Sequence, residues 1–308
     1  MKIGLLKYDH SLRPVRAQNL GDEIQSLAAS QFLPKVDTLF NRDTLANAEA
    51  DEPHLLIMNG FFSPTPETSF PPSKSIVPIF VGFHISSRKE SIRHFLRPSS
   101  IEYFKKHEPI GCRDRKTMEM LQSKGVEAFY SKCLTITFER RLKSPENGKI
   151  FLVDIDKLIP IPQPIRSGAV WVSQDIPADT SSETKFRLAQ QFLDRYRDEA
   201  KLVITTRLHC ALPCIAMGIP VIFFGNPASY RVSIPKDLGL VINRYRLPTG
   251  GILKPFLSPR LKILRPFVNP QLLTSTLSIN WDPDPLDIES EKEVLRKLVR
   301  DRVAEYLI

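Results

Sequence analysis

Short apolar blocks alternate with longer amphipathic stretches along the first half of the chain. The apolar blocks are rich in branched and aromatic residues, which favour buried strands. We expect strands at Lys2–Leu6, Leu55–Met58, Val77–Phe83, Pro109–Cys112 and Val126–Tyr130. Apolar positions at helical spacing predict helices over 21–33, over 91–106 with a break near Pro98, and over 114–124. This alternation predicts an α/β arrangement.

The alternation restarts after a polar, turn-rich stretch at 139–148, which is the best candidate for a linker. We expect further strands at Ile150–Asp154, Ala169–Ser173, Lys201–Thr205 and Ile219–Phe224, and helices at Ser182–Ala200 and Leu208–Met217. Alternation on both sides of a linker predicts two α/β domains with largely parallel sheets, at 1–145 and 146–308. The second domain is expected to contain an irregular proline-rich segment at 248–288 and a terminal helix at 289–307.

The composition is that of a globular protein, with 42% hydrophobic and 25% charged residues, which excludes wholesale disorder. The chain contains no apolar run of the roughly 18 residues that a membrane-spanning helix needs. The N-terminal segment has too short an apolar core for a signal peptide. Four cysteines in 308 residues do not form a disulfide scaffold, so we expect a cytoplasmic protein.

The net charge of +9 comes from two separate basic segments. Residues 84–145 carry a net charge of +7 and residues 201–270 a net charge of +9, and the remaining segments are mildly acidic. Basic segments so far apart in sequence suggest one anionic partner that is held by two parts of the fold. Two solvated basic faces are the alternative interpretation.

The strongest local motif is Thr205-Thr206-Arg207-Leu208-His209, between a predicted strand and the following helix. Ligands of open α/β sheets bind at the carboxyl ends of strands, and the free N–H groups of a helix start favour anions. Arg207 can bind a phosphate or carboxylate through two hydrogen bonds, and His209 can donate a proton near neutral pH. Alternatively, Arg207 pairs with a surface acid and His209 faces solvent.

A second strand-to-helix junction, at 110–115, lies in the other basic segment. Arg113 occupies the turn, and Asp114 is placed to cap the helix. A doubly charged anion held between two domains would use both junctions, whereas a cap beside solvated arginines is the simpler alternative.

Three polar groups follow other predicted strands. Asp22 could cap the helix that opens at Gly21 or accept a proton from a sugar hydroxyl, and Asn59 precedes two aromatic residues suited to holding a sugar. His84 ends the third predicted strand and so lies toward the edge where ligands bind. A plain cap, an ordinary turn and a structural histidine are the corresponding alternatives.

Several common sites are absent from the sequence. There is no GxGxxG, phosphate-binding P-loop, HExxH, CxxC or Gly-x-Ser-x-Gly motif, so we expect no cofactor, no metal and no serine-hydrolase chemistry. Cys210 and Cys214 lack partners at metal-binding spacing and are interpreted as core residues. The basic residues are not interleaved with aromatic ones as in a stacking groove, so no nucleic-acid partner is expected.

Six short segments together resemble the polysaccharide pyruvyl transferase family. They run in family order over about residues 3–224 and are Asn19–Gln25 (NLGDEIQ), Asn59–Phe62 (NGFF), Phe83–Ser86 (FHIS), Ile110–Thr117 (IGCRDRKT), Ser131–Thr137 (SKCLTIT) and Arg207–Val221 (RLHCALPCIAMGIPV). The stretch Trp281–Leu298 also resembles tails of that family. One departure concerns 131–133, where Ser-Lys-Cys stands in place of the Asp-Pro pair of many members and Lys132 in place of a glycine.

The resemblance implies a glycosyltransferase-B-like fold, with two Rossmann-like domains facing a cleft. It also implies transfer of pyruvate from phosphoenolpyruvate onto a sugar as a cyclic ketal, with release of phosphate. The family's donor-binding residues map onto Arg207, Leu208 and His209 in the second domain, and an additional donor arginine maps onto Arg113. The first domain would then take the acceptor, a polysaccharide or a lipid-linked sugar.

On this basis we hypothesise that His209 is the general acid or orients the phosphate, and that Asp22 or Glu23 is the base toward the acceptor hydroxyl. Asn59 and His84 are expected to contact substrate, and Lys132 adds a cation. A lipid-linked acceptor would place the protein peripherally at the inner face of an anionic membrane. The alternatives are a glycosyltransferase that uses a nucleotide sugar and a non-catalytic binder of nucleic acid or anionic glycan.

Overall fold

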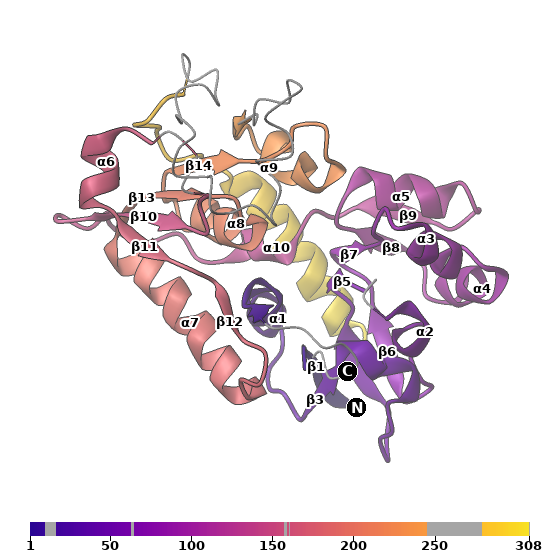
Figure 1. Ribbon diagram of the computed structural model, residues 1–308. Coiled ribbons are helices and arrows are strands. Elements are labelled where there is room, and N and C mark those ends of the chain that lie inside the picture. Colours follow the sequence, from indigo (N-terminus) through magenta and orange to yellow (C-terminus); the bar gives the residue numbers. More distant parts are fainter. Residues whose placement is uncertain (10–16, 63–64, 157–158, 160, 245–278, 308) are drawn as a thin grey trace. The chain divides into compact units, whose positions relative to one another are not determined.

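The protein is a mixed α/β fold built on several parallel sheets, as a computed structural model shows (Figure 1). The structure describes residues 1–9, 17–62, 65–156, 159, 161–244 and 279–307. The α/β class with largely parallel sheets that the sequence predicts is thereby confirmed.

Two four-stranded parallel sheets are formed by the first 130 residues. The first sheet has the strand order β3-β1-β4-β6, and its strands are β1 (Lys2–Lys7), β3 (Thr38–Asn41), β4 (His54–Ile57) and β6 (Ile76–Ile79). The second has the order β5-β7-β8-β9, and its strands are β5 (Gly60–Phe61), β7 (Phe83–His84), β8 (Ile110–Cys112) and β9 (Ala128–Tyr130).

The later part of the chain forms a five-stranded parallel sheet with the order β11-β10-β13-β14-β15. Its strands are β10 (Lys149–Val153), β11 (Val170–Val172), β13 (Ala200–Thr205), β14 (Val221–Phe224) and β15 (Ile242–Asn243). A short antiparallel pair is formed by β2 (Ala17–Asn19) and β12 (Asp175–Pro177).

Most predicted helices are present. The longer ones are α1 (Gly21–Ser30), α3 (Lys89–Phe95), α4 (Pro98–Lys106), α5 (Arg115–Gln122), α7 (Ser182–Glu199), α8 (Leu208–Ala216) and α10 (Glu289–Ala304). Short ones are α2 (Pro66–Ser69), α6 (Gln163–Gly168), α9 (Ser233–Asp237) and the 3-10 helices η1 (Arg42–Asn47), η2 (Leu134–Thr137) and η3 (Tyr230–Val232). The predicted break near Pro98 is confirmed, since Pro98 starts α4.

One predicted strand is wrong. Val77–Phe83 is not a single strand, because β6 ends at Ile79 in the first sheet and β7 begins at Phe83 in the second. Gly82, at φ +76°, adopts a left-handed conformation that continues no strand and that L side chains rarely adopt. The apolar run therefore crosses from one sheet to the other.

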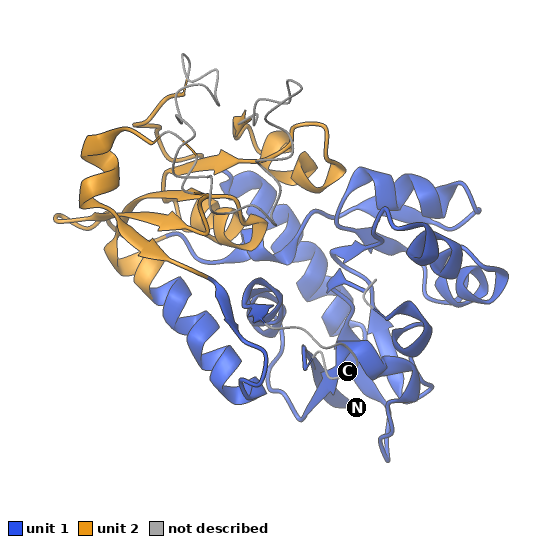
Figure 2. Ribbon diagram, in the orientation of Figure 1, with its two compact units in different colours: residues 1–140, 174–194, 288–308 blue, residues 141–173, 195–287 orange. Residues whose placement is uncertain are grey.

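The chain divides into two compact units, shown in Figure 2. The first consists of residues 1–140, 174–194 and 288–308, and the second of residues 141–173 and 195–287. Neither unit follows the continuous ranges 1–145 and 146–308 that the sequence suggests as domains. The segment with β12 and the start of α7, and the terminal helix α10, group with the first unit, and the division falls within α7.

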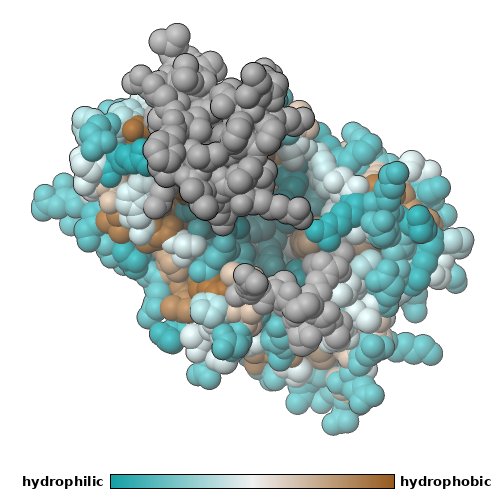
Figure 3. All heavy atoms as spheres, in the orientation of Figure 1, coloured by the Kyte–Doolittle hydropathy of each residue, from teal (hydrophilic) through white to brown (hydrophobic). Residues whose placement is uncertain are grey.

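Each unit has an apolar core. In the first unit the core contains an aromatic cluster whose members are all buried, namely Phe70, Phe80, Phe83, Phe95 and Phe104. In the second, the core lies on the large parallel sheet and includes Leu152, Ile204, Ile222 and Phe224. On the face seen in Figure 3, hydrophilic side chains dominate and apolar ones are scattered among them.

The terminal helix is confirmed as α10, which ends at Ala304, within the predicted range 289–307. Of the predicted irregular segment 248–288, residues 248–278 lie outside the described residues, and 279–288 contain no helix or strand. Arg246, Arg260 and Arg265 of the second basic segment also lie outside the described residues.

Candidate functional site

In the first unit, the predicted site residues gather at the carboxyl ends of parallel strands. Asn59 follows β4, His84 ends β7, Arg113 follows β8 and Lys132 follows β9. Carboxyl ends of parallel strands share one edge of a sheet, and ligands of α/β folds bind at that edge. The contacts described below join the edges of the two sheets of this unit into one polar cluster.

Gln25, a completely buried residue of α1, connects three of the predicted site residues. Its Nε2 donates to Oδ1 of Asp22 over 3.1 Å, and its Oε1 accepts from Nη1 of Arg113 at 3.4 Å. Its backbone carbonyl accepts from Nδ2 of Asn59 at 2.8 Å. Asp22, Asn59 and Arg113 therefore belong to one hydrogen-bonded network. The sequence placed Gln25 in a family motif but pointed to no role for it.

Asp22 is not a helix cap, contrary to one expectation. Leu20 already has helical dihedrals and is the N-cap of α1, so Asp22 lies inside the first turn. Its Oδ2 contacts Nη1 of Arg42 at 3.4 Å, and the completely buried Arg42 guanidinium lies 4.7 Å from the ring centroid of Tyr8. Burial opposes the charge of Arg42, but Asp22 and Asp43 hold the pKa of the guanidinium above its usual value.

Glu23, the next residue of α1, is buried and has an unusual pKa. Burial, together with the negative charge of Asp22, raises the pKa of Glu23 to about 8, against the opposing charge of Lys185. A carboxyl group that titrates near neutral pH can both accept and release a proton under physiological conditions. A pKa in this range suits a general base.

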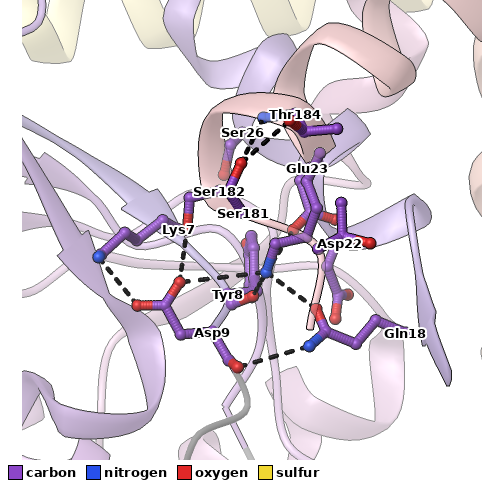
Figure 4. A network of polar contacts seen from close by, with 12 residues as sticks. Lys7, Tyr8, Asp9, Gln18, Asp22, Glu23, Ser26, Ser181, Ser182 and Thr184 are labelled. Carbon is purple, nitrogen blue, oxygen red and sulfur yellow. Dashed lines mark hydrogen bonds and ion pairs between the residues drawn. The ribbon is translucent and has the colours of Figure 1, made fainter. Parts of the chain in front are cut away.

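Lys185 of α7 approaches Glu23 and is itself almost completely buried. Its Nζ lies 3.8 Å from Oε1 of Glu23, donates to the carbonyl oxygen of Tyr8 and donates to Oε1 of Gln18 over 2.9 Å. Figure 4 shows the surrounding network, in which Ser182 Oγ donates to Oδ1 of Asp9 at 2.5 Å. The start of α7 is thus fastened to the end of β1 and to α1 through buried charges.

His84 is hydrogen-bonded to Asp114, and both side chains are buried. The Nδ1 atom of His84 lies 2.6 Å from Oδ2 of Asp114, and Thr117 donates to the same carboxylate from its N–H and its hydroxyl. Asp114 is the N-cap of α5, as predicted. Burial would raise the pKa of Asp114, but the bond from His84 and the charges of His84 and Arg113 hold it below its usual value.

Lys132 adopts a left-handed backbone conformation, with φ at +62°. The family resemblance predicts a glycine at this position, and glycine is the residue that a left-handed backbone favours. The carbonyl of Lys132 and the side chain of Asn59 both lie within 4 Å of the position a Cβ would take on Gly82. Lys132 therefore belongs to the same edge as Asn59.

In the second unit, Arg207, Leu208 and His209 form the junction between β13 and α8. Arg207 is the N-cap of α8, and its N–H donates to Oγ1 of Thr205 over 2.9 Å. Its Nε donates to Oδ2 of Asp154 over 2.9 Å. The expected arrangement of an arginine and a histidine at the carboxyl end of a parallel strand and the start of a helix is therefore present. The carboxylate that accepts this hydrogen bond belongs to Asp154, which directly follows β10.

Sequence reasoning overlooked four contributors to these clusters, which are Gln25, Arg42, Asp154 and Lys185. None lies in a recognisable catalytic motif, and their partners lie up to 177 positions away, as for Lys185 and Tyr8. Asp154 could have been found, because it is the last residue of the predicted strand Ile150–Asp154 and so lies at the edge where ligands bind. Cys210 and Cys214 are buried in the core of the second unit, as expected.

The sequence pattern of the polysaccharide pyruvyl transferase family matches residues 19–227. The match covers about two thirds of the chain, from the segment before α1 to the loop after β14. The chain therefore belongs to the polysaccharide pyruvyl transferase family, as its motifs suggested, and family membership identifies it as a transferase that acts in polysaccharide modification.

The comparisons add little beyond the family. No curated protein matches the chain. Among solved structures, one similar chain is a functionally uncharacterised protein from Klebsiella pneumoniae, with 14% identity and a TM-score of 0.42. The likeness covers 77% of this chain and 88% of that one, and at this level it says nothing about activity.

In the described part of the chain, no helix combines the length and the apolar composition that spanning a membrane requires. No group of three or more histidine, cysteine or acidic side chains is placed there to hold a metal ion.

Proposed function

We propose that this protein transfers the pyruvate unit of phosphoenolpyruvate to hydroxyls of a polysaccharide or lipid-linked sugar, forming a ketal and releasing phosphate. The observation that carries the proposal is the placement of Arg207 and His209 at the start of α8, in a chain of this family. Phosphoenolpyruvate carries a phosphate and a carboxylate, and arginine beside free helix N–H groups is suited to both.

The donor side of the proposal is the second unit, and the acceptor side is the first. Arg207 binds a donor anion, and Arg113 contributes a second guanidinium. Leu208 contacts the donor, while Asn59, His84 and Lys132 contact substrate. A glycosyltransferase-B-like fold, with two Rossmann-like domains around a cleft, implies this assignment of donor and acceptor to different units.

The chemistry needs one acid and one base. His209 protonates the methylene carbon of the donor, which makes the adjacent carbon electrophilic, and a sugar hydroxyl attacks that carbon while Glu23 or Asp22 takes its proton. A second hydroxyl of the same sugar then displaces phosphate and closes the ketal, and its proton leaves with the phosphate. The pKa of about 8 at Glu23 supports that residue as the base, because it can accept a proton near neutral pH.

The test is phosphate release from phosphoenolpyruvate with a panel of sugar acceptors, lipid-linked ones included. We expect Arg207→Ala and His209→Ala to abolish release. Arg197→Ala is a matched control, because Arg197 is an exposed arginine that pairs with Asp198. Full activity of either site variant contradicts the assignment. Thermal stabilisation by a nucleotide sugar but not by phosphoenolpyruvate would instead favour a glycosyltransferase.

If the acceptor is lipid-linked, the protein is expected to act at a membrane surface. We propose that the two basic segments, 84–145 and 201–270, bring the protein to the inner face of an anionic membrane, where such acceptors reside. Flotation with vesicles containing anionic lipid tests this, with vesicles of neutral lipid as the control. Equal recovery with both kinds of vesicle contradicts peripheral binding and leaves the transfer reaction untouched.

A further inference from the structure

Asp154 connects three segments at the carboxyl end of β10 in the second unit. Its Oδ2 accepts from Nε of Arg207 at 2.9 Å, and its Oδ1 accepts from Oγ of Ser173 at 2.6 Å. Its carbonyl accepts from Oγ1 of Thr206 at 3.0 Å, and its N–H donates to the carbonyl of Val172 over 3.1 Å. Both oxygens of the carboxylate and both backbone polar groups are thereby engaged.

The backbone of Asp154 is held in an uncommon conformation, with φ at +49°. A left-handed backbone is unfavourable for an L residue, although aspartate and asparagine tolerate it better than most. Conformations of this kind persist where the surrounding contacts enforce them, and they cluster at functional sites. Here the contacts of the carbonyl and the N–H enforce it, and the conformation directs the carboxylate to Arg207.

The two side chains of the ion pair between Asp154 and Arg207 differ in their exposure to solvent. The side chain of Asp154 is 11% exposed and that of Arg207 is 30% exposed, so the carboxylate lies deeper than the guanidinium that it contacts. A guanidinium is planar, with five N–H donors in a fixed fork. A carboxylate that accepts a hydrogen bond from Nε therefore restricts the orientation of the whole guanidinium group.

We infer that Asp154 is a positioning residue that orients the guanidinium of Arg207 for the anionic donor, an inference that rests on the proposed function. A negative charge beside a donor-binding arginine weakens the attraction of that arginine for an anion. Its presence beside Arg207 therefore indicates that the orientation of the guanidinium matters more for donor binding than the net charge. Preorganised donors spare the enzyme the cost of ordering them when the anion binds. Asp154 itself touches no substrate in this role.

The first test is Asp154→Asn, which removes the charge but keeps an acceptor oxygen and a residue type that tolerates the left-handed backbone. We expect the KM for phosphoenolpyruvate to rise about tenfold, with a much smaller change in kcat. The matched control is Asp198→Asn. Asp198 accepts from Nε of Arg197 at 2.7 Å in the same manner, but on the surface, so no change is expected. An unchanged KM in Asp154→Asn overturns the inference.

The second test asks whether Asp154 acts through Arg207. Arg207→Lys keeps the positive charge and loses the planar fork that Asp154 orients. In that background Asp154→Asn should cause no further rise in the KM for phosphoenolpyruvate. A loss that simply multiplies with that of Arg207→Lys shows that Asp154 acts on the donor independently, which contradicts a positioning role.

The third test does not depend on the donor. In protein labelled with ¹⁵N-arginine, the Nε–H signal of Arg207 should exchange slowly with solvent in the wild type and faster in Asp154→Asn. If this holds while wild-type protein neither binds nor turns over phosphoenolpyruvate, the positioning contact stands and the proposed function falls. If the wild type turns over the donor, but Asp154→Asn changes neither the exchange of the Nε–H signal nor the KM, the proposed function stands and the inference is wrong.

Discussion

His84 and Asp114 form an almost completely buried pair, with Nδ1 of the histidine 2.6 Å from Oδ2 of the carboxylate. His84 lies in β7, and Asp114 follows the neighbouring strand β8 of the second sheet. Thr117 donates a further hydrogen bond to the carboxylate of Asp114. A histidine that looks isolated in the sequence is therefore fixed in the structure. Its orientation is set by a carboxylate that also caps α5.

Asp114→Asn should destabilise the protein by about 2 kcal/mol, because it weakens a buried charge-assisted hydrogen bond while asparagine still caps α5. The pKa of Asp114 is held below its usual value, so its contribution to stability is complete above the ordinary carboxyl pKa and is lost as the pH falls through the lowered one. Urea unfolding of wild type and variant should therefore converge toward acid pH. Asp198→Asn, at an exposed pair, is the control. A difference that grows on acidification contradicts the pairing.

Glu23→Gln should change the pH dependence of stability in the opposite sense. The pKa of Glu23 is raised to about 8 from an ordinary 4.5, so the folded state holds this proton more tightly than the unfolded chain. The stabilisation is complete below the ordinary pKa and is lost as the pH rises through about 8. Relative to wild type, the glutamine variant should gain stability as the pH increases. Unfolding by urea on both sides of neutrality measures this.

The same variant tests the catalytic assignment separately. If Glu23 is the base, wild-type phosphate release should rise with pH as the carboxyl group ionises around 8, and Glu23→Gln should lack this limb of the profile. Asp22→Asn is the comparison, because Asp22 is the other candidate. A limb that survives in Glu23→Gln but disappears in Asp22→Asn moves the role to Asp22.

Lys185→Met should destabilise the protein by about 3 kcal/mol, since it leaves two buried acceptors, the carbonyl of Tyr8 and Oε1 of Gln18, without their donor. The variant should also raise the pKa of Glu23 further, because the charge of Lys185 now lowers it. Lys149→Met is the control, since Lys149 forms an exposed pair with Glu199. Equal unfolding midpoints for the two methionine variants would show that the Lys185 contacts contribute nothing to stability.

Lys132→Gly and Lys132→Ala separate the backbone of Lys132 from its charge. Both remove the cation, but only glycine relieves the left-handed conformation at φ +62°. The glycine variant should be more stable than the alanine variant by about 1 kcal/mol. If Lys132 contacts substrate, both should raise the KM for the donor or the acceptor to the same extent. An alanine variant at least as stable as the glycine variant contradicts strain at this position.

Much of the architecture could be predicted from the local pattern of the sequence. Apolar strand-like runs and amphipathic stretches marked β1, β4, β8, β10, β13 and β14 and the longer helices, because burial on both faces selects continuous apolar strands. The two strand-to-helix junctions were visible for the same reason. The pattern failed at 77–83, where a continuous apolar run leaves one sheet and enters another at Gly82.

The sequence alone therefore determined the α/β class, the family and the residue types at the carboxyl ends of the strands. Only the tertiary structure decided which of these side chains meet. Gln25 joins Asp22, Asn59 and Arg113, Lys185 approaches Glu23, and Asp154 binds Arg207. The physical reason is that strand and helix formation depends on neighbours in the chain, whereas hydrogen bonds and pKa values depend on burial and on charges that folding brings together from distant positions.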